Sequence, residues 1–173
     1  MKAISYYIYI VFFVLLGSCN QQSKPDDVEK EISNETLIGI NKALVNEEQE
    51  QIADYIQRYG YQMEATETGL HYLKTLEGTG AAPEFRSLVI LNYKINFLNG
   101  DYCYSSDSSG VLQFRMGQSD EPSGLQEGLM KLKAGDKAIF IVPSYLAYGL
   151  TGDGNKIGPS KTLVYHVELL KVE

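Results

Sequence analysis

The sequence predicts an α+β fold, an antiparallel β-sheet with one short helix, preceded by an N-terminal helical segment. Three observations favour this class. Apolar residues recur with the helical period before Gly60, the period becomes two from Gly69 onward, and a single helical stretch at 124–135 interrupts the strands. With 173 residues of ordinary globular composition, the chain is long enough for one domain and an appendage.

Residues 1–18 have the pattern of an export signal. Lys2 precedes an apolar run over Ile8–Leu16, and small residues follow. The run is shorter than the roughly 20 residues that span a bilayer, so a retained transmembrane helix is the weaker alternative. The motif Leu16-Gly17-Ser18-Cys19 resembles the lipobox of bacterial lipoproteins, in which the signal is removed and the cysteine carries lipid. We therefore expect Cys19 to anchor the protein to a membrane of the cell envelope, facing the periplasm by default.

Residues 19–33 are polar, contain Pro25 and lack an apolar period, which is typical of a flexible tether. Two helices are then expected within 34–65, one capped by Asn34 and one by Asn46. Their apolar positions are Leu37, Ile40, Leu44 and Val45 in the first, and Ile52, Tyr55, Ile56 and Tyr59 in the second. This apolar face must pack on something, either the following domain or a second copy of the chain.

Five segments with alternating or continuous apolar residues predict strands. They cover residues 69–80, 87–104, 111–117, 136–143 and 161–172. Asn99-Gly100 divides the second segment and predicts a tight hairpin turn, since both central residues of that turn need a positive φ. Between the third and fourth segments, Leu125, Leu129 and Leu132 share one helical face, with Gly135 just beyond the helix.

Charge and cysteine content exclude several classes of function. The formal net charge is −7 and the basic residues are scattered, so nucleic acid is not an expected partner. Lipidation of Cys19 leaves Cys103 as the one remaining thiol, which excludes an intramolecular disulfide. His71 and His166 lie far apart in sequence, so we expect no metal and no cofactor.

The stretch "GLQEGLMKLKAGDKAIFIVPSYLAYGLTG" followed by "GPSKTLVYHVELLKVE" resembles the second half of the FKBP-type peptidyl-prolyl isomerase domain. The resemblance extends back through "FRMG", "YSSDSSG" and "VILNYKI" to about Thr66, so it covers residues 66–173. It implies a twisted antiparallel sheet wrapped around a short helix. It also implies that the loop after Ala147-Tyr148-Gly149 overhangs a shallow apolar pocket that receives a proline ring.

The resemblance assigns roles to particular residues. Tyr148 and Tyr93 are the candidate catalytic residues, with the Tyr148 hydroxyl as a hydrogen-bond donor to the substrate carbonyl. The candidate substrate-binding residues are Tyr104, Phe114, Leu125, Ile157 and Tyr165.

The sequence also departs from the family pattern. Cys103-Tyr104 stands where the family usually has Phe-Asp, Leu125 where it has Trp, and Glu121-Pro122 where it has Val-Ile. The Arg that commonly pairs with the family Asp is absent as well, so no buried charge is left without its partner. Pro122 removes a backbone N–H that the family offers to bound ligands, so we expect the family's macrocyclic inhibitors to bind poorly.

A narrower resemblance concerns the lipobox, the short helical segment, "CYSS" and "PSYLAYG", which look like the gliding-motility-associated lipoprotein isomerases of Bacteroidetes. It implies proline-containing exported polypeptides as clients and the motility or secretion machinery as a partner. Two alternatives stay open: a binding module or chaperone with little catalysis, and a structural lipoprotein of an envelope assembly.

Overall fold

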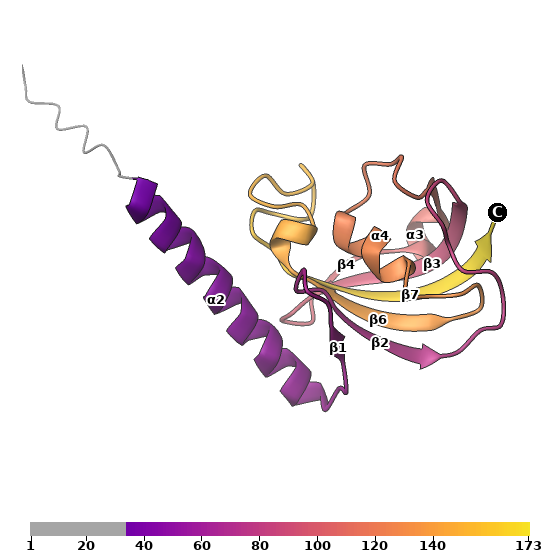
Figure 1. Ribbon diagram of the computed structural model, residues 1–173, viewed down its shortest axis with the longest axis horizontal. Helices are drawn as coiled ribbons and strands as arrows, with labels where there is room; N and C mark the ends of the chain where they lie inside the picture. Colours follow the sequence, from indigo (N-terminus) through magenta and orange to yellow (C-terminus); the bar gives the residue numbers. More distant parts are fainter. Residues whose placement is uncertain (1–33) are drawn as a thin grey trace, which may run out of the picture. The chain divides into compact units, whose positions relative to one another are not determined.

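The structure is a computed structural model that describes residues 34–173 (Figure 1). The expected signal peptide, the lipidated Cys19 and the tether lie outside the described residues. Within residues 34–173 no helix combines the length and the apolar character needed to cross a bilayer.

Helix α2 runs without a break from Asn34 to Tyr59. The predicted division into two helices at Asn46 is wrong, because an Asn inside a helix costs only about 0.7 kcal/mol or less and no glycine or proline stands beside it. The helix ends at the predicted place. The N–H of Tyr61, just past Gly60, donates to the carbonyl of Ile56 at 3.1 Å and so satisfies one of the last helical carbonyls.

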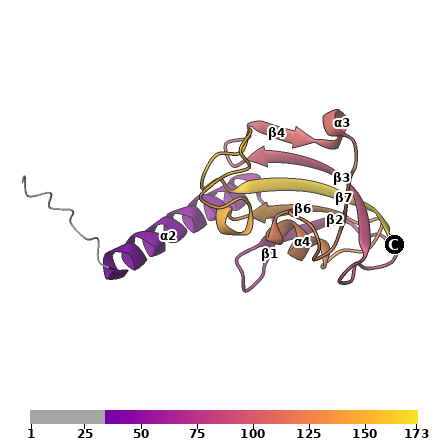
Figure 2. The same ribbon diagram turned by 90° about the horizontal axis from the view of Figure 1, so that it is seen from above.

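The described strands form one antiparallel sheet, which confirms the α+β class (Figures 1 and 2). Along the sheet the order is β1-β2-β6-β7-β3-β4, and β5 pairs with β3. The strands are β1 (Glu64–Ala65), β2 (His71–Leu76), β3 (Leu88–Phe97), β4 (Tyr102–Ser105), β5 (Leu112–Arg115), β6 (Lys137–Val142) and β7 (Leu163–Val172). Three short helices complete the domain: α3 (Ser106–Ser109), α4 (Ser123–Leu129) and the 3₁₀ turn η1 (Ser144–Leu146).

Helix α4 is shorter than the sequence predicts. It ends at Leu129, and Gly135 lies in the turn before β6 instead of following the helix directly. Leu132 is nevertheless buried, since the chain after the helix stays against the sheet. The helix approaches the sheet closely at Gly128, where an added Cβ would lie 2.6 Å from the Phe140 ring.

The hairpin between β3 and β4 is wider than the predicted two-residue turn. Phe97 and Asp101 pair across it, with Phe97 N–H donating to the Asp101 carbonyl at 3.0 Å. Only Gly100, at φ 92°, has a positive φ, while Asn99 does not. The connection is therefore a three-residue loop that closes on a glycine, a geometry that needs one positive φ where the predicted turn needs two.

The two faces of the sheet carry different layers. One face buries Phe140, Tyr165 and Leu125 in a cluster that includes α4. Neighbouring residues in β6 and β7 point to the other face, where Ile139, Ile141 and Val164 pack against two residues of α2. These are Ile52 and Tyr55, so the second half of α2 docks on the domain, which is the first of the two expected alternatives. The apolar residues of its first half, Leu37, Ile40, Leu44 and Val45, are exposed.

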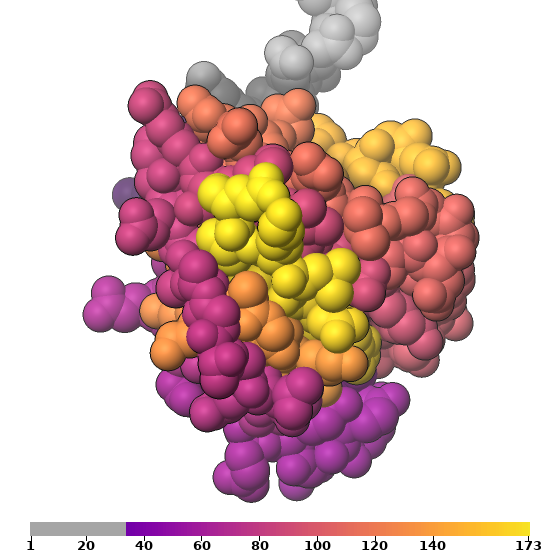
Figure 3. Space-filling model, turned by 90° about the vertical axis from the view of Figure 1, so that its right-hand side faces the viewer, coloured from indigo at the N-terminus to yellow at the C-terminus, as the bar shows by residue number. Residues whose placement is uncertain are grey.

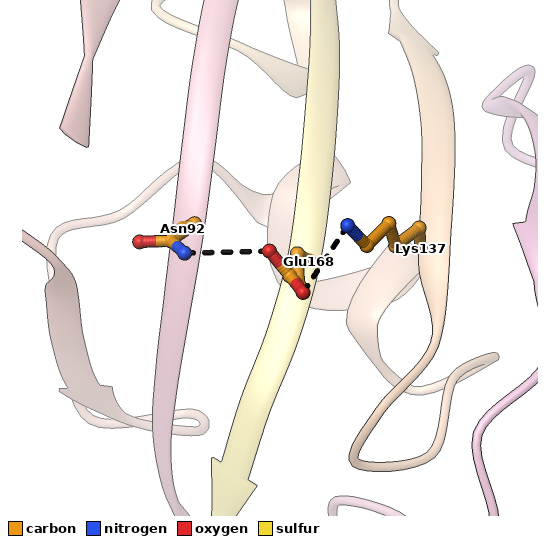
Figure 4. Close-up of polar contacts among 3 residues, drawn as sticks. All are labelled: Asn92, Lys137 and Glu168. Carbon is orange, nitrogen blue, oxygen red and sulfur yellow. Dashed lines mark hydrogen bonds and ion pairs between the residues drawn. The ribbon is translucent and has the colours of Figure 1, made fainter. Parts of the chain in front are cut away.

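A polar ladder crosses the three central strands (Figure 4). Asn92 of β3 donates to Glu168 of β7 at 3.3 Å, and Lys137 of β6 lies 3.3 Å from the same carboxylate. Both neighbours are direct register partners of Glu168. An exposed ion pair contributes little stability, so this ladder mainly favours one register over its alternatives.

The pairing of β3 with β7 continues to Glu173. Leu88 N–H donates to the Glu173 carbonyl at 2.8 Å, and Glu173 N–H donates back at 2.9 Å. Figure 3 shows the C-terminal residues, in yellow, among magenta and orange atoms of earlier segments.

Candidate functional site

All seven residues that the sequence singled out meet in the cluster on the α4 face of the sheet. Four of them are buried and three are half-buried against it. The buried ones are Phe114, Leu125, Ile157 and Tyr165, and the half-buried ones are Tyr93, Tyr104 and Tyr148. Their elements are β3, β4, β5, α4, β7 and the long loop between β6 and β7, here called the β6–β7 loop (residues 143–162).

Tyr148 follows the 3₁₀ turn η1, which fixes the start of the β6–β7 loop. The N–H of Gly149 donates to the Ser144 carbonyl at 2.8 Å and so closes the turn around Tyr148. Burial, with the carboxylates of Glu121 and Asp153 nearby, raises the pKa of Tyr148 to about 12. Tyr148 therefore carries a protonated hydroxyl at every physiological pH and is available as a hydrogen-bond donor.

Tyr165 extends from β7 into the bottom of the cluster and is only 1% exposed. Burial raises its pKa well above the ordinary value, and the neighbouring Tyr148 and Glu121 add to this effect. The Tyr148 hydroxyl lies close enough to contribute to this rise in pKa, but the two hydroxyls do not meet in good hydrogen-bond geometry.

Tyr104 has a partner that the sequence analysis missed. Its hydroxyl donates to Oδ2 of Asp153, in the β6–β7 loop, at 2.6 Å. The other oxygen of Asp153 accepts the N–H groups of Asn155 and Ile157, each at 2.8 Å. Partial burial opposes ionisation of Asp153, but these three hydrogen bonds outweigh it and lower the pKa of the carboxyl. The site therefore still contains a carboxylate beside Tyr104, but Asp153 of the β6–β7 loop supplies it instead of strand β4.

Lys156 is a second residue that the sequence analysis missed. Its Nζ donates to the Cys103 carbonyl at 3.1 Å and lies 5.0 Å from the centre of the Tyr104 ring. Its backbone N–H donates to the Tyr104 hydroxyl oxygen at 3.3 Å. Tyr104 is therefore held by Asp153 and Lys156 together, and it ties β4 to the loop that carries Ile157.

Gly152 allows the β6–β7 loop to fold back on itself. Its φ is +69°, and an added Cβ would lie 2.1 Å from the Ile157 carbonyl oxygen. The neighbouring N–H of Asp153 donates to that same carbonyl at 2.9 Å, which brings Ile157 back toward the cluster. Only glycine fits this position, because it combines a left-handed backbone with a contact shorter than any side chain tolerates.

Gln126 of α4 holds the segment that precedes the helix. Its Oε1 accepts the Gly117 N–H at 2.7 Å, and its Nε2 donates to the Glu121 carbonyl at 2.8 Å. Pro122 is buried and forms the N-cap of α4. The Glu121 side chain is partly buried beside the cluster, and burial, with Asp120 adjacent, raises its pKa.

The described residues include no group of three or more His, Cys, Asp or Glu side chains placed to hold a metal ion.

Residues 80–170, more than half of the chain, match the family model described as FKBP-type peptidyl-prolyl cis-trans isomerase. The chain belongs to this family. The match includes the whole β6–β7 loop and every one of the seven clustered residues.

Curated members of the family are similar over the same region. The chain is 37% identical over 111 residues to a probable FKBP-type peptidyl-prolyl cis-trans isomerase FkpA of Neisseria meningitidis, covering 64% of this chain and 40% of that protein. It is 38% identical over 97 residues to FK506-binding protein 1 of Saccharomyces cerevisiae, covering 55% and 85%. The chain thus spans about two fifths of the length of the FkpA relatives that it matches.

Solved structures agree on the fold. The crystal structure of FkpA from Escherichia coli has a TM-score of 0.66 and 31% identity, over 80% of this chain and 64% of that one. A peptidyl-prolyl cis-trans isomerase from Pseudomonas syringae has a TM-score of 0.65 and 25% identity, over 76% and 95%. These likenesses confirm the predicted FKBP-like fold.

The raised pKa of Glu121 predicts a pH-dependent stability. The folded state binds the proton of Glu121 more tightly than the unfolded chain, where a Glu titrates near about 4.3, so stability falls as pH rises through the folded pKa. Glu121→Gln, which carries no charge, is expected to raise the melting temperature at pH 7. The gain should shrink as the pH is lowered toward about 4.3.

Thermal unfolding of both proteins between pH 4 and 8 measures this effect. Glu77→Gln, which removes an exposed carboxylate, is the matched control and should change the melting temperature little at any pH. A gain from Glu121→Gln that is independent of pH, or a loss at pH 7, would contradict the assignment.

Proposed function

We propose that the chain is a peptidyl-prolyl cis-trans isomerase. The observation that carries this proposal is the gathering of Tyr93, Phe114, Ile157 and Tyr165 in one cluster with Tyr148, whose hydroxyl is protonated, on the fold of this family. The names of the curated relatives support the same activity.

The reaction suits a site without an acid, a base or a metal. Rotation about an X–Pro bond breaks no covalent bond and passes through a twisted amide about 18–20 kcal/mol above the planar forms. In the twisted state the nitrogen lone pair no longer delocalises into the carbonyl, so the amide is less polar than in the ground state. An apolar pocket that fits this state binds it more strongly than the planar forms, and this difference in binding lowers the barrier.

The required energy is modest. A 10⁴-fold acceleration corresponds to about 5.5 kcal/mol of preferential binding of the twisted state. Burial of a proline ring against a few aromatic side chains, together with one hydrogen bond, is of this order. In this account Ile157 and Tyr165 contact the ring, Tyr93 and Phe114 support the pocket, and the Tyr148 hydroxyl donates to the substrate carbonyl.

A second candidate function is a binding module that keeps the pocket with little catalysis. Tyr104, Pro122 and Leu125 favour it, because each departs from the family pattern at the pocket. Leu125 is fully buried and belongs to the same cluster, so the smaller side chain is packed without exposure. Tyr104 is fully engaged with Asp153 and Lys156, so it acts in holding the loop as well as in lining the pocket.

We further propose that the protein is a lipoprotein of the cell envelope that assists the folding of proline-containing exported proteins, including components of gliding motility or secretion. The lipobox-like Leu16–Cys19 and the polar tether after it support the anchor. The resemblance to gliding-motility lipoproteins supports the choice of clients.

Exchange NMR on a small X–Pro peptide, with and without the full-length protein in detergent, tests the activity. Tyr148→Phe is expected to lower kcat/KM about tenfold, since it removes one donor worth about 1.4 kcal/mol in the transition state. Tyr145→Phe is the matched control, because that nearby hydroxyl donates to the Thr68 carbonyl instead. Absence of acceleration by the wild-type protein would favour the binding module.

Mass spectrometry of the protein from native membranes tests the anchor. We expect an N-terminal Cys19 that carries lipid. We expect the Cys19→Ala variant to be absent from the membrane fraction while its residues 34–173 stay folded. An unmodified Cys19, or a Cys19→Ala variant that stays membrane-bound, would contradict the anchor.

A further inference from the structure

Glu48 of α2 reaches the β6–β7 loop from far away in the sequence. Its carboxylate accepts three hydrogen bonds, from the N–H of Ser144 at 2.7 Å, from the Ser144 hydroxyl at 3.0 Å, and from the Thr162 hydroxyl. Both partners belong to the β6–β7 loop, 96 and 114 residues beyond Glu48. All three donors are uncharged, so the carboxylate is held by hydrogen bonds and not by a cation.

The two partners of Glu48 are the two ends of the loop. Ser144 lies just after β6, and Thr162 lies just before β7. Tyr148 and Ile157 lie between them. One carboxylate thus holds together the two points from which the loop leaves the sheet, and it does so directly beneath the turn that presents Tyr148.

Packing of α2 determines where Glu48 sits. Ile52 and Tyr55 follow it by four and seven residues, so all three share one face of the helix. Ile52 and Tyr55 are buried against Ile139, Ile141 and Val164, the strand residues beside the two loop ends. The apolar contact therefore fixes the helix, and the fixed helix presents Glu48 to the loop.

A groove of about 750 Å³ lies beside Glu48, lined by Leu44 and Val45 of the helix, by Leu150 and Gly158 of the loop, and by Leu98 and Asn99 of the β3–β4 turn. Among the described residues, the hydrogen bonds between α2 and the loop are those of Glu48. They are the directional contacts by which α2 acts on the loop.

We propose that Glu48 is a positioning residue of the isomerase site. It keeps the two ends of the β6–β7 loop together, and so holds Tyr148 and Ile157 over the pocket. On this view α2 is part of the site and not only a spacer between the domain and the membrane. The inference rests on the proposed isomerase function for its catalytic consequence, but its effect on the loop does not depend on activity.

Hydrogen exchange and catalysis together test this role in the full-length protein. In Glu48→Ala, the amides of Gly149 and Ser160 should exchange at least about tenfold faster, because they are bonded to carbonyls within the loop. The kcat/KM for an X–Pro peptide should fall about tenfold at a temperature where the variant is fully folded. Glu47→Ala, the exposed neighbouring carboxylate, should change neither quantity.

Substitutions at the other end separate positioning from general stability. Thr162→Ser keeps a hydroxyl for Glu48 and should retain both loop protection and kcat/KM, whereas Thr162→Val should lose both. Combining Glu48→Ala with Thr162→Val should add little further loss, because each variant alone already breaks the link between the two loop ends. Glu48→Gln, which keeps one acceptor oxygen, should fall between the wild type and Glu48→Ala and serves if Glu48→Ala does not fold.

Three results can be told apart: a positioning role of Glu48, a merely structural contact, and failure of the proposed isomerase function. A lower melting temperature in Glu48→Ala and Thr162→Val, with loop exchange and kcat/KM unchanged, would show a merely structural contact and overturn the proposal. If the wild-type protein shows no acceleration, the proposed function fails, while loop exchange still decides whether Glu48 positions the loop.

Discussion

Strand β7 is the constraint on which the rest of the structure depends. It pairs with β6 on one side and β3 on the other, and its side chains alternate between the two faces of the sheet. Leu163, Tyr165 and Val167 must be covered on one face. Helix α4 covers part of that face, closely because of Gly128, and Ile157 of the β6–β7 loop is buried in the same cluster as Tyr165. The candidate site thus depends on a very short helix and on the loop that complements it.

Two carboxylates fix the conformation of the glycine-rich β6–β7 loop at the site. Asp153 folds the middle of the loop onto Tyr104, and Glu48 joins its two ends. Within the described residues neither carboxylate forms an ion pair; each accepts hydrogen bonds from backbone N–H groups and hydroxyls. Such bonds are directional, so they fix geometry more strictly than a surface ion pair would. This suits a site whose proposed action depends on shape.

The sequence predicted the fold class, strands β2 to β7 and the clustering of seven site residues, because alternating apolar residues and the family motifs are local signals. It missed the two-residue strand β1 and the short helix α3, which are too short to show a period. It failed where a long-range contact decided the outcome. Asn46 is a good N-cap in isolation, yet α2 continues through it, because an internal Asn costs little once the second half of the helix is docked on Ile139 and Val164. Nothing near Asp153 or Glu48 in the sequence indicates Tyr104, Ser144 or Thr162 as their partners. The "DGNKIG" turn was a usable signal for Asp153, as an Asp before Gly often accepts following N–H groups.

In the proposed mechanism, catalysis depends on preferential binding of a twisted amide, and the Tyr148 hydroxyl donates a hydrogen bond but never transfers its proton. The solvent isotope effect on kcat/KM tests this claim most directly, measured by exchange NMR on an X–Pro peptide in H₂O and in D₂O. Because no proton moves in the rate-limiting step, the account predicts a ratio close to one. A large normal isotope effect, with the slower rate in D₂O, would show proton transfer in that step and contradict the mechanism.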